Sequence, residues 1–425
     1  MILRLLRRRE SRIARIPAFL TACCAGLLWG GCSTDVVTEE ELHYNDIEVP
    51  FEATLKPDTV GFGALPPRQA RYILNLDEPA EVLTDPARRS FRVDELFQIR
   101  ATAGGDSVRI TSWSARTVRD VTLEIYLQDF DLYVPVARMD SIPGFGQFEF
   151  RPSFVGQRVT CETDKGDFIS FFCRSFDPER LKPRLVSDDG HFRMLQQIDA
   201  RWSVQFTNGS LARESYAECS ALYAREWVVI LTNFAYLMTT PEYRHLMQAE
   251  NFRKVFGGDL CGNDRQPFAP EKYLSEAERF KAPMNFRCGR SSNDDGNSGY
   301  GGGGLWLIQH FCFYGHYASF SGWEVIAHEF MHNMGYGHES NMTYAWGDVG
   351  YTSLIWQLHI YLNTAGRLPY TDRNLLGFHK PENAPYRDGG IRTDFLDDAT
   401  LEAEIRRFHD KSAVVRYFDE NPLTE

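Results

Sequence analysis

The segment HEFMHNMGYGH, residues 328–338, constrains the fold of this chain more than any other stretch of its sequence. His328 and His332 are four residues apart, so on an α-helix both imidazoles lie on one face, about one turn apart. Gly335 can take a positive φ and end that helix, which lets His338 return from the following loop as a third nitrogen donor. Three histidines around one point, with a fourth position left open, form the ligand set of a catalytic zinc site.

Glu329, directly after the first histidine, is predicted to be the general base of this site. Its side chain points roughly 100° round the helix from that of His328, so the carboxylate can reach a water on the metal without being a ligand. Zinc lowers the pKa of a water that it binds from about 15.7 to roughly 7. Glu329 would take the proton of this water and pass it to the leaving amine, so the pattern predicts peptide-bond hydrolysis.

These residues resemble the signature HExxHxxGxxH of the metzincin clan of zinc metallopeptidases, and SNMTY (340–344) is similar to the SxMxY form of the clan's Met-turn. The resemblance implies an α+β catalytic domain with a mixed sheet, a long active-site helix and a small C-terminal subdomain. It also implies that Met342 is the Met-turn residue and that Tyr344 lies near the metal, as a fifth ligand or an oxyanion stabiliser. Only three residues separate His338 from Met342, so the chain resembles a compact bacterial branch more than the astacins, serralysins or matrix metallopeptidases.

Another class of zinc peptidase, the gluzincins, takes its third ligand from a glutamate on a later helix. Between Ser340 and Pro381 this chain has no glutamate, and its only acidic residues are Asp348 and Asp372. His338 is therefore the better candidate for the third ligand.

Residues 1–31 are predicted to be a signal peptide of the lipoprotein type. A basic start is followed by an apolar run, Ile16–Trp29, which is too short to span a membrane and has the length of a signal core. The run ends in LLWGGCS, which resembles a bacterial lipoprotein cleavage site with Cys32 as the lipidated residue. An ordinary signal peptide with an incidental cysteine is the alternative. Either way we expect an exported protein, and with the lipid a periplasmic or cell-surface protein anchored to a membrane, such as the outer membrane.

The charge of the mature chain argues against nucleic acid as a partner. The leader holds six arginines and one glutamate, so its removal takes the net charge from −12 to −17. An acidic surface of this kind repels a phosphate backbone and suits a solvated protein outside the cytoplasm.

Cysteine usage predicts disulfides. Apart from the leader and Cys32, six cysteines remain, namely Cys161, Cys173, Cys219, Cys261, Cys288 and Cys312. An even number in an exported chain predicts up to three disulfides, and the two pairings that we expect are Cys161–Cys173 and Cys261–Cys288. No CxxC pair is present, so a second zinc bound by cysteines is not expected.

The mature chain is predicted to have two domains after a polar tether, residues 32–45. Strict alternation of apolar and polar residues in segments such as 121–127 predicts a β-sandwich over residues 46–158. This accessory domain would be a spacer or a module that binds substrate or glycan. Aromatic residues that could serve binding are Trp113, Tyr126 and Tyr133.

The catalytic domain is predicted to span residues 159–425. We expect a strand at 201–206, a buried helix at 211–238 and an amphipathic helix at 352–363. A turn-rich region is expected to end at Gly304, and within it residues 289–304 are predicted by their composition to be a flexible loop. A strand is expected to follow at 305–314. The resemblance to metzincins implies that a protein or peptide substrate binds in extended form along this strand, through main-chain hydrogen bonds.

The loop before that strand also holds Asp294, Asp295 and Asn297, which could bind calcium, although their spacing lacks a full EF-hand loop. His310, His316 and His359 are interpreted as packed histidines rather than metal ligands. The sequence therefore predicts an exported zinc metalloendopeptidase. The alternatives are a catalytically inactive surface-binding protein on the same fold, and a zinc hydrolase that acts on a non-peptide amide or a glycoconjugate.

Overall fold

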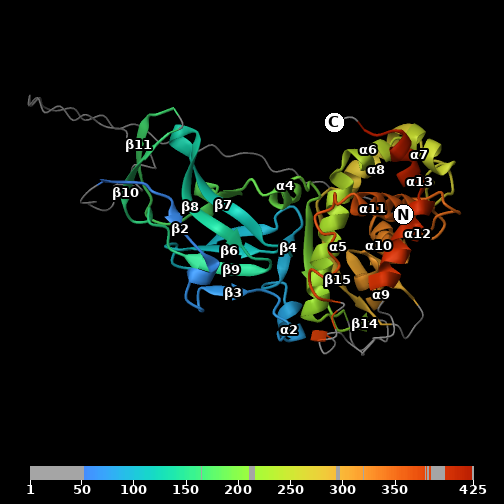
Figure 1. Ribbon diagram of the computed structural model, residues 1–425, viewed down its shortest axis with the longest axis horizontal. Helices are drawn as coiled ribbons and strands as arrows, with labels where there is room; N and C mark the ends of the chain where they lie inside the picture. Colours follow the sequence, from blue (N-terminus) through green and yellow to red (C-terminus); the bar gives the residue numbers. More distant parts are fainter. Residues whose placement is uncertain are drawn as a thin grey trace, which may run out of the picture. The chain divides into compact units, whose positions relative to one another are not determined.

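The computed structural model describes residues 52–423, apart from residues 164, 210–215, 293–296, 319, 379, 381 and 384–397. The predicted signal peptide, Cys32 and the tether lie outside the described residues, as do Asp294 and Asp295. The described chain is mixed α+β with several sheets, as the sequence predicts at this coarse level (Figure 1). None of its described helices is both long enough and apolar enough to cross a membrane.

Two four-stranded sheets in the first half of the chain form two layers over a common core. One has the order β12-β7-β8-β2, with strands β12 (Arg184–Val186), β7 (Val118–Leu127), β8 (Leu132–Ile142) and β2 (Asp58–Thr59). The other has the order β3-β9-β6-β5, with strands β3 (Ala70–Tyr72), β9 (Gly146–Phe150), β6 (Val108–Ser112) and β5 (Phe97–Ala101). Alternate apolar residues from both sheets, such as Leu123 and Ile110, are fully buried in one cluster, which explains the period-2 pattern of the sequence.

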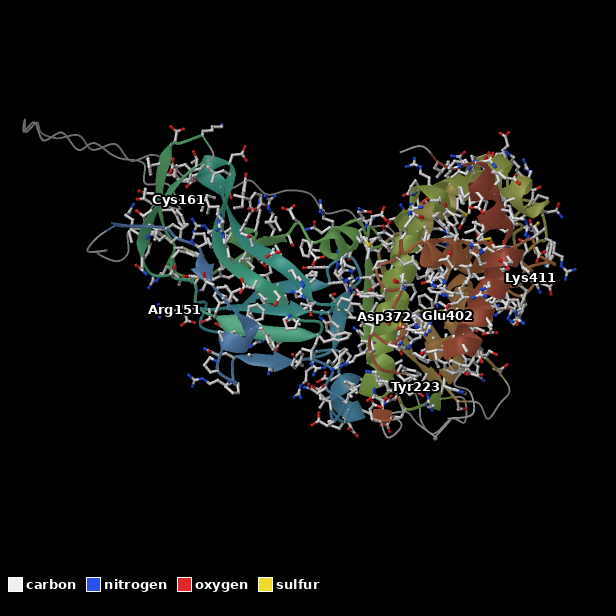
Figure 2. The ribbon with its side chains drawn as sticks, viewed as in Figure 1. Arg151, Cys161, Tyr223, Asp372, Glu402 and Lys411 are labelled. Atoms are coloured by element: carbon white, nitrogen blue, oxygen red, sulfur yellow. The ribbon has the colours of Figure 1, made fainter. Side chains whose placement is uncertain are left out.

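A third sheet shows that the first predicted disulfide is wrong. It has the order β1-β10-β11, with strands β1 (Glu52–Thr54), β10 (Arg158–Glu162) and β11 (Phe168–Phe172). Cys161 lies on β10 (Figure 2). In the β10–β11 register it lies opposite Ile169, four residues before Cys173. Four residues of strand span roughly 13 Å, well beyond the reach of a disulfide.

The second predicted pairing, Cys261–Cys288, is also wrong. Cys288 lies on strand β15 (Met284–Ser291), where the neighbouring thiol is that of Cys219. All six cysteines of the described part of the chain are buried free thiols.

The second half of the chain is built on a six-stranded mixed sheet. Five of its strands have the order β16-β17-β15-β13-β4, and the sixth, β14, pairs with β15. The other strands are β16 (Gly299–Gly302), β17 (Leu305–Ile308), β13 (Trp202–Phe206), β4 (Ser90–Arg92) and β14 (Tyr216–Ala217). Strands β13, β15 and β17 are parallel, whereas β16 and β4 run antiparallel to their neighbours. In the described part of the chain, β16 is therefore an edge strand of this sheet.

Two long helices cover the same face of the six-stranded sheet (Figure 1). Phe234 on α5 (Ala221–Thr239) and Phe330 on α10 (Phe320–Asn333) lie 5.1 Å apart between ring centroids. Both rings also contact Trp202 of β13 and Trp306 of β17, at 5.2–5.9 Å between ring centroids. This dry aromatic cluster fixes α10 on the sheet, and aromatic pairs of this kind contribute about 0.5–1.5 kcal/mol each beyond their buried area.

The remaining helices complete both halves. In the first half they are α2 (Ala80–Leu83), α3 (Pro178–Leu181), α4 (Gly190–Gln196) and the 3₁₀ turns η1 (Phe62–Ala64) and η2 (Gln128–Phe130). In the second half they are α6 (Pro241–Leu246), α7 (Ala249–Phe256), α8 (Pro270–Phe280), α9 (His310–Gly315), α11 (Tyr351–Thr364), α12 (Asp398–Lys411) and α13 (Ala413–Glu420). Helix α11 confirms the helix predicted at 352–363.

The predicted strand 305–314 is only half correct. Strand β17 ends at Ile308, and helix α9 begins at His310. The run LWLIQHFCFY is apolar throughout, and such a run does not show by periodicity whether it is a strand or a buried helix. Strand β17 is moreover paired on both sides, with β15 and β16, so it has no free edge for an extended peptide.

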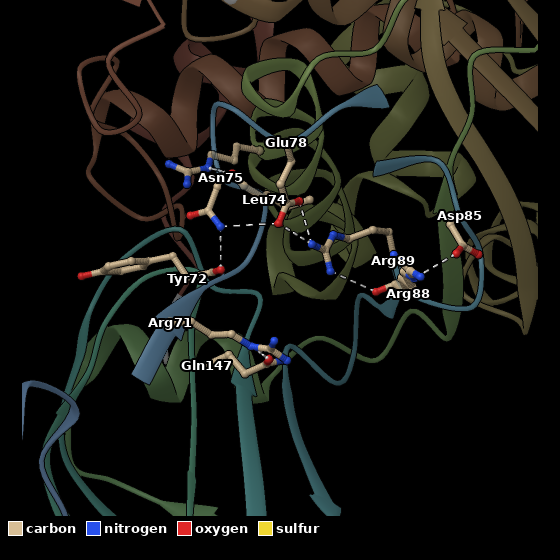
Figure 3. A network of polar contacts seen from close by, with 10 residues as sticks. Arg71, Tyr72, Leu74, Asn75, Glu78, Asp85, Arg88, Arg89 and Gln147 are labelled. Atoms are coloured by element: carbon tan, nitrogen blue, oxygen red, sulfur yellow. Dashed lines mark hydrogen bonds and ion pairs between the residues drawn. The ribbon is translucent and has the colours of Figure 1, made fainter. Parts of the chain in front are cut away.

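The predicted domain boundary at residue 158 is not a boundary between sheets. Strand β12, after it, pairs with β7 of the first half, and strand β4, before it, pairs with β13 of the second half. The chain between β3 and β4 is held by polar contacts (Figure 3). Arg89 donates to both carboxylate oxygens of Glu78, at 2.7 and 2.6 Å, and Arg225 of α5 donates to the Leu74 carbonyl at 2.7 Å.

A buried histidine lies where the two halves meet. The Nε2 atom of His191 lies 3.2 Å from the Ser114 hydroxyl, and its ring packs on Tyr370, whose hydroxyl also donates to Ser114. Burial, aided by the positive charge of Arg116, lowers the pKa of His191 from 6.5 to about 4. The folded protein therefore holds this imidazole neutral over a range in which the unfolded chain protonates it.

We expect the free energy of unfolding to fall as the pH drops from about 6.5 towards 4. In this window the unfolded chain binds a proton at His191 that the folded chain does not, and the loss amounts to about 2 kcal/mol by pH 5. Above pH 7 both states are neutral and the effect vanishes. Urea titrations at pH 7.5 and pH 5 measure it, and His191→Gln should remove this part of the pH dependence. An equal loss in both proteins would place the acid sensitivity elsewhere.

Candidate metal centre

Helix α10 carries the metal-binding candidates because one of its faces is anchored in the core. Trp323, Ile326, Phe330 and Met331 are at most 1% exposed and pack under the helix. His328 lies on the neighbouring face, is 7% exposed and lines the cleft described below. The apolar spacing thus fixes which way the histidines point.

The helix ends where the sequence predicts. Gly335 has φ +82°, and the Tyr336 amide donates to the Met331 carbonyl, which closes the last turn. The loop that follows is clamped by Asn263, which donates to the Gly335 carbonyl at 3.0 Å and accepts from the Gly337 amide at 2.8 Å. This clamp brings the next residue, His338, back to the helix.

The three predicted ligands come together at one point. The Nε2 atom of His332 lies 3.0 Å from Nε2 of His328 and 3.0 Å from Nε2 of His338, and one ligand nitrogen of each ring lies within 4.8 Å of the others. Two nitrogens bound to one tetrahedral zinc at about 2.05 Å are roughly 3.3 Å apart, which is close to these distances.

The tautomers of two of these histidines also fit a metal. Nδ1 of His328 donates to the Thr343 carbonyl at 2.9 Å, and Nδ1 of His332 donates to the Tyr336 carbonyl at 2.8 Å. A carbonyl only accepts, so each Nδ1 carries the proton and each Nε2 presents a lone pair. Burial lowers the pKa of His328 to about 4 and also lowers that of His332. Both rings are therefore neutral at pH 7, and no proton separates the Nε2 lone pairs that point at one another. A bound cation satisfies them, and second-sphere carbonyls of this kind orient metal-binding histidines.

The turn at 340–344 holds His328 in this orientation. Ser340 donates to the Cys261 carbonyl at 2.6 Å, and the Asn341 side chain accepts from the Cys261 amide at 2.7 Å. Met342 is fully buried, and the Thr343 hydroxyl donates to the Gly337 carbonyl at 2.8 Å. The turn is thus tied to both neighbouring loops, and its Thr343 carbonyl is fixed as the acceptor for His328.

Glu329 lies beside the three histidines. One of its carboxylate oxygens is 4.0 Å from Nε2 of His328, and the residue is only 5% exposed. Burial raises the pKa of this carboxyl group from 4.5 to about 8. The carboxyl group can therefore reach a small molecule at the histidine cluster from the side, as a base or acid rather than as a fourth ligand.

Strand β16 lies directly over Glu329, and its glycines allow this. A Cβ atom at Gly299 would lie 2.7 Å from the Glu329 carboxylate, and one at Gly301 would overlap the Glu329 carbonyl. Asn333, at the end of α10, fastens the β16–β17 turn by accepting from the Gly304 amide and donating to the Leu305 carbonyl, both at 2.8 Å. Sequence reasoning treated this glycine-rich stretch as a flexible loop. The signal for a strand was the alternation of Gly299 and Gly301, which leaves one face bare.

The histidines open into a cleft of about 490 Å³ between β16 and the 340–344 turn. Tyr344, which the resemblance placed near the metal, lines this cleft and is 48% exposed. Its ring centroid lies 4.3 Å from that of His328 and 5.0 Å from that of His338. Burial, together with the negative charges of Glu329 and Glu324, raises the pKa of the Tyr344 hydroxyl, so it is a proton donor at neutral pH.

The other histidines that the sequence singles out lie outside this cluster. His316 is fully buried, with its Nε2 atom 2.6 Å from Glu226, and His359 packs on Trp323 at 4.3 Å between ring centroids. His310 is buried on α9. Among the described residues, the one group of three or more potential ligands is His328, His332 and His338.

Compared with known proteins, the chain matches no protein-family model, no curated protein and no solved structure. What the site can do therefore follows from its own residues and geometry.

Proposed function

We propose that this chain is an exported zinc metallopeptidase of the metzincin type, lipid-anchored at Cys32. The observation that carries the proposal is the convergence of three imidazole Nε2 atoms beside the buried carboxyl group of Glu329, inside an open cleft. Nitrogen ligands from three histidines favour zinc over magnesium or calcium, which prefer oxygen. The helix, the glycine turn and the fully buried Met342 of the 340–344 turn all support a metzincin-like arrangement.

Each functional group of the cleft would have its own role in hydrolysis. A bound zinc ion would supply Lewis acidity, which makes a water more acidic and polarises the scissile carbonyl. Burial alone favours the protonated form of Glu329, but the positive charge of an ion at the histidines would favour its carboxylate, which takes the proton from the attacking water and delivers it to the leaving amine. Tyr344, as a neutral phenol at the cleft surface, donates to the oxyanion that develops on the carbonyl.

The position of β16 at the edge of the sheet supports an extended peptide as the substrate. Its residues line the cleft that contains the histidines, and the other edge of β16 pairs with β17. A peptide that adds to this edge as a further strand is held through main-chain groups, whatever its side chains. The resemblance to metzincins implied this role for residues 305–314, and we assign it instead to residues 299–302.

Metal removal tests the proposed function. We expect the purified mature chain, loaded with zinc, to cut a denatured proteome, and a chelator to abolish the cutting. Added zinc should restore it, and sequencing the new termini identifies the cut sites. Cutting that persists with the chelator places the chemistry elsewhere. Zinc binding without any cutting favours an inactive binding protein, or a hydrolase of other amides.

A further inference from the structure

A second cavity, of about 640 Å³, adjoins the cleft that holds the histidines. Glu324 lines both hollows, so it stands at the point where they meet. The second cavity is enclosed by the start of α10, the 345–348 loop, the start of α11 and the α12–α13 junction. Part of its wall therefore comes from the C-terminal helices of the chain.

Glu324 lies four residues before His328 on α10, so the two side chains share a face of the helix, one turn apart. Its side chain is half-buried, and burial raises the pKa of its carboxyl group. It has no hydrogen bond or ion pair with any described residue. A partly desolvated carboxylate without a partner stabilises a cation placed beside it.

Three aromatic rings behind Glu324 form one wall of the cavity. Phe320 lies 5.5 Å from Trp356 and 5.1 Å from Phe408 between ring centroids, and the latter two rings are 5.8 Å apart. Such a wall packs against the methylene stem of a long side chain and attracts a cation at its end.

The basic residues of the cavity do not cancel this preference. Three carboxyl groups, those of Glu324, Asp348 and Asp410, outnumber the two cations of the lining, Lys411 and Arg416. The Arg416 guanidinium donates to the backbone carbonyls of Asp410 and Lys411, at 3.4 and 3.0 Å. Lys411 itself is exposed at the end of α12 (Figure 2). The carboxylates of Asp348 and Asp410 line the cavity as well.

We propose that this cavity is a side-chain pocket of the cleft, and that it takes an arginine or lysine side chain of a peptide substrate, with Glu324 binding the cationic end. The inference rests on the proposed peptidase function and specifies its substrate class. A peptide along β16 that passes the histidines presents a side chain towards Glu324. The basic residue therefore occupies one fixed position close to the cut bond.

The test compares two peptides that differ only at this position, with arginine in one and the uncharged isostere citrulline in the other. For the zinc-loaded chain we expect kcat/KM to be about tenfold or more higher for the arginine peptide. Glu324→Gln should reduce that ratio to near one, and Glu324→Lys should make a glutamate peptide the better substrate. Glu271→Gln, an exposed site on α8, is the matched control and should keep the wild-type ratio.

The outcomes separate this inference from the proposed function. Chelator-sensitive cutting without preference for basic residues overturns the pocket assignment alone. A basic preference that survives in a folded, zinc-loaded Glu324→Gln protein also overturns it. If Glu324→Gln does not fold, the arginine-to-citrulline ratio of the wild-type chain still decides whether the pocket prefers a cation. Absence of any chelator-sensitive cutting overturns both proposals.

Discussion

Replacing Glu329 by glutamine is expected to lower kcat about 10²- to 10⁴-fold, with zinc still bound. Glutamine has the shape of glutamate, so it fits under β16, where Gly299 leaves room for little else. The amide cannot take a proton from the attacking water or return one to the leaving amine. The histidine nitrogens are untouched, since Glu329 lies 4.0 Å from Nε2 of His328 and is not one of the converging groups.

Two measurements on the same protein check this expectation. Steady-state cleavage of a peptide taken from the proteome cut sites gives kcat, and metal analysis gives the zinc content per chain. Glu329→Ala should behave in the same way, without the isosteric amide. Glu339→Gln is the matched control, because this carboxylate is exposed and pairs with Arg265. An unchanged kcat in both Glu329 variants would mean that another group is the base.

The parts of the site that the sequence predicted are those encoded within a few residues of one another. The spacing of His328 and His332, the helix end at Gly335 and the return of His338 depend on local backbone geometry. Helix α11 is encoded in the same way, by an apolar pattern over its own length. For each of these, the structure places the side chains where the local pattern indicates.

Strand β16 is an element that local sequence patterns do not predict. A glycine-rich stretch has no β-propensity of its own, and Gly299–Gly302 becomes a strand because β17 pairs with it and Asn333 fastens the turn between them. The close approach of its bare face to Glu329 is a tertiary contact. The sequence-based assignment of the whole stretch as a flexible loop was therefore wrong where the cleft needs a rigid edge.

The two disulfide predictions were wrong because the number and spacing of cysteines do not show which residues lie opposite one another in a sheet. Cys161 and Cys173 flank a short turn in sequence, but the β10–β11 pairing sets Cys161 against Ile169. For the same reason, the sequence did not indicate that β4 belongs to the six-stranded sheet. Ser90–Arg92 joins β13, more than a hundred residues later, and no local pattern announces that partner. The same holds for the Glu324 cavity, whose far wall comes from α12 and α13.

Replacing His332 by alanine is expected to abolish stoichiometric zinc binding, and activity with it. Nε2 of His332 is 3.0 Å from that of each other histidine, so its loss leaves two ligands and opens the centre of the cluster. Two imidazoles bind zinc far more weakly than three, and metal affinity is coupled to the stability of the fold. Zinc should therefore raise the Tm of the wild-type chain but not that of His332→Ala.

The two largest effects differ in a way that identifies the site. Glu329→Gln separates metal binding from turnover, because it removes a proton carrier and leaves the ligands in place. His332→Ala removes both together, because turnover depends on the ion. His245→Ala, which removes a half-buried histidine on α6, is the control for losing an imidazole outside the cleft. A His332→Ala protein that binds zinc as tightly as the wild-type chain would move the metal centre away from α10, and with it the role proposed for Glu329.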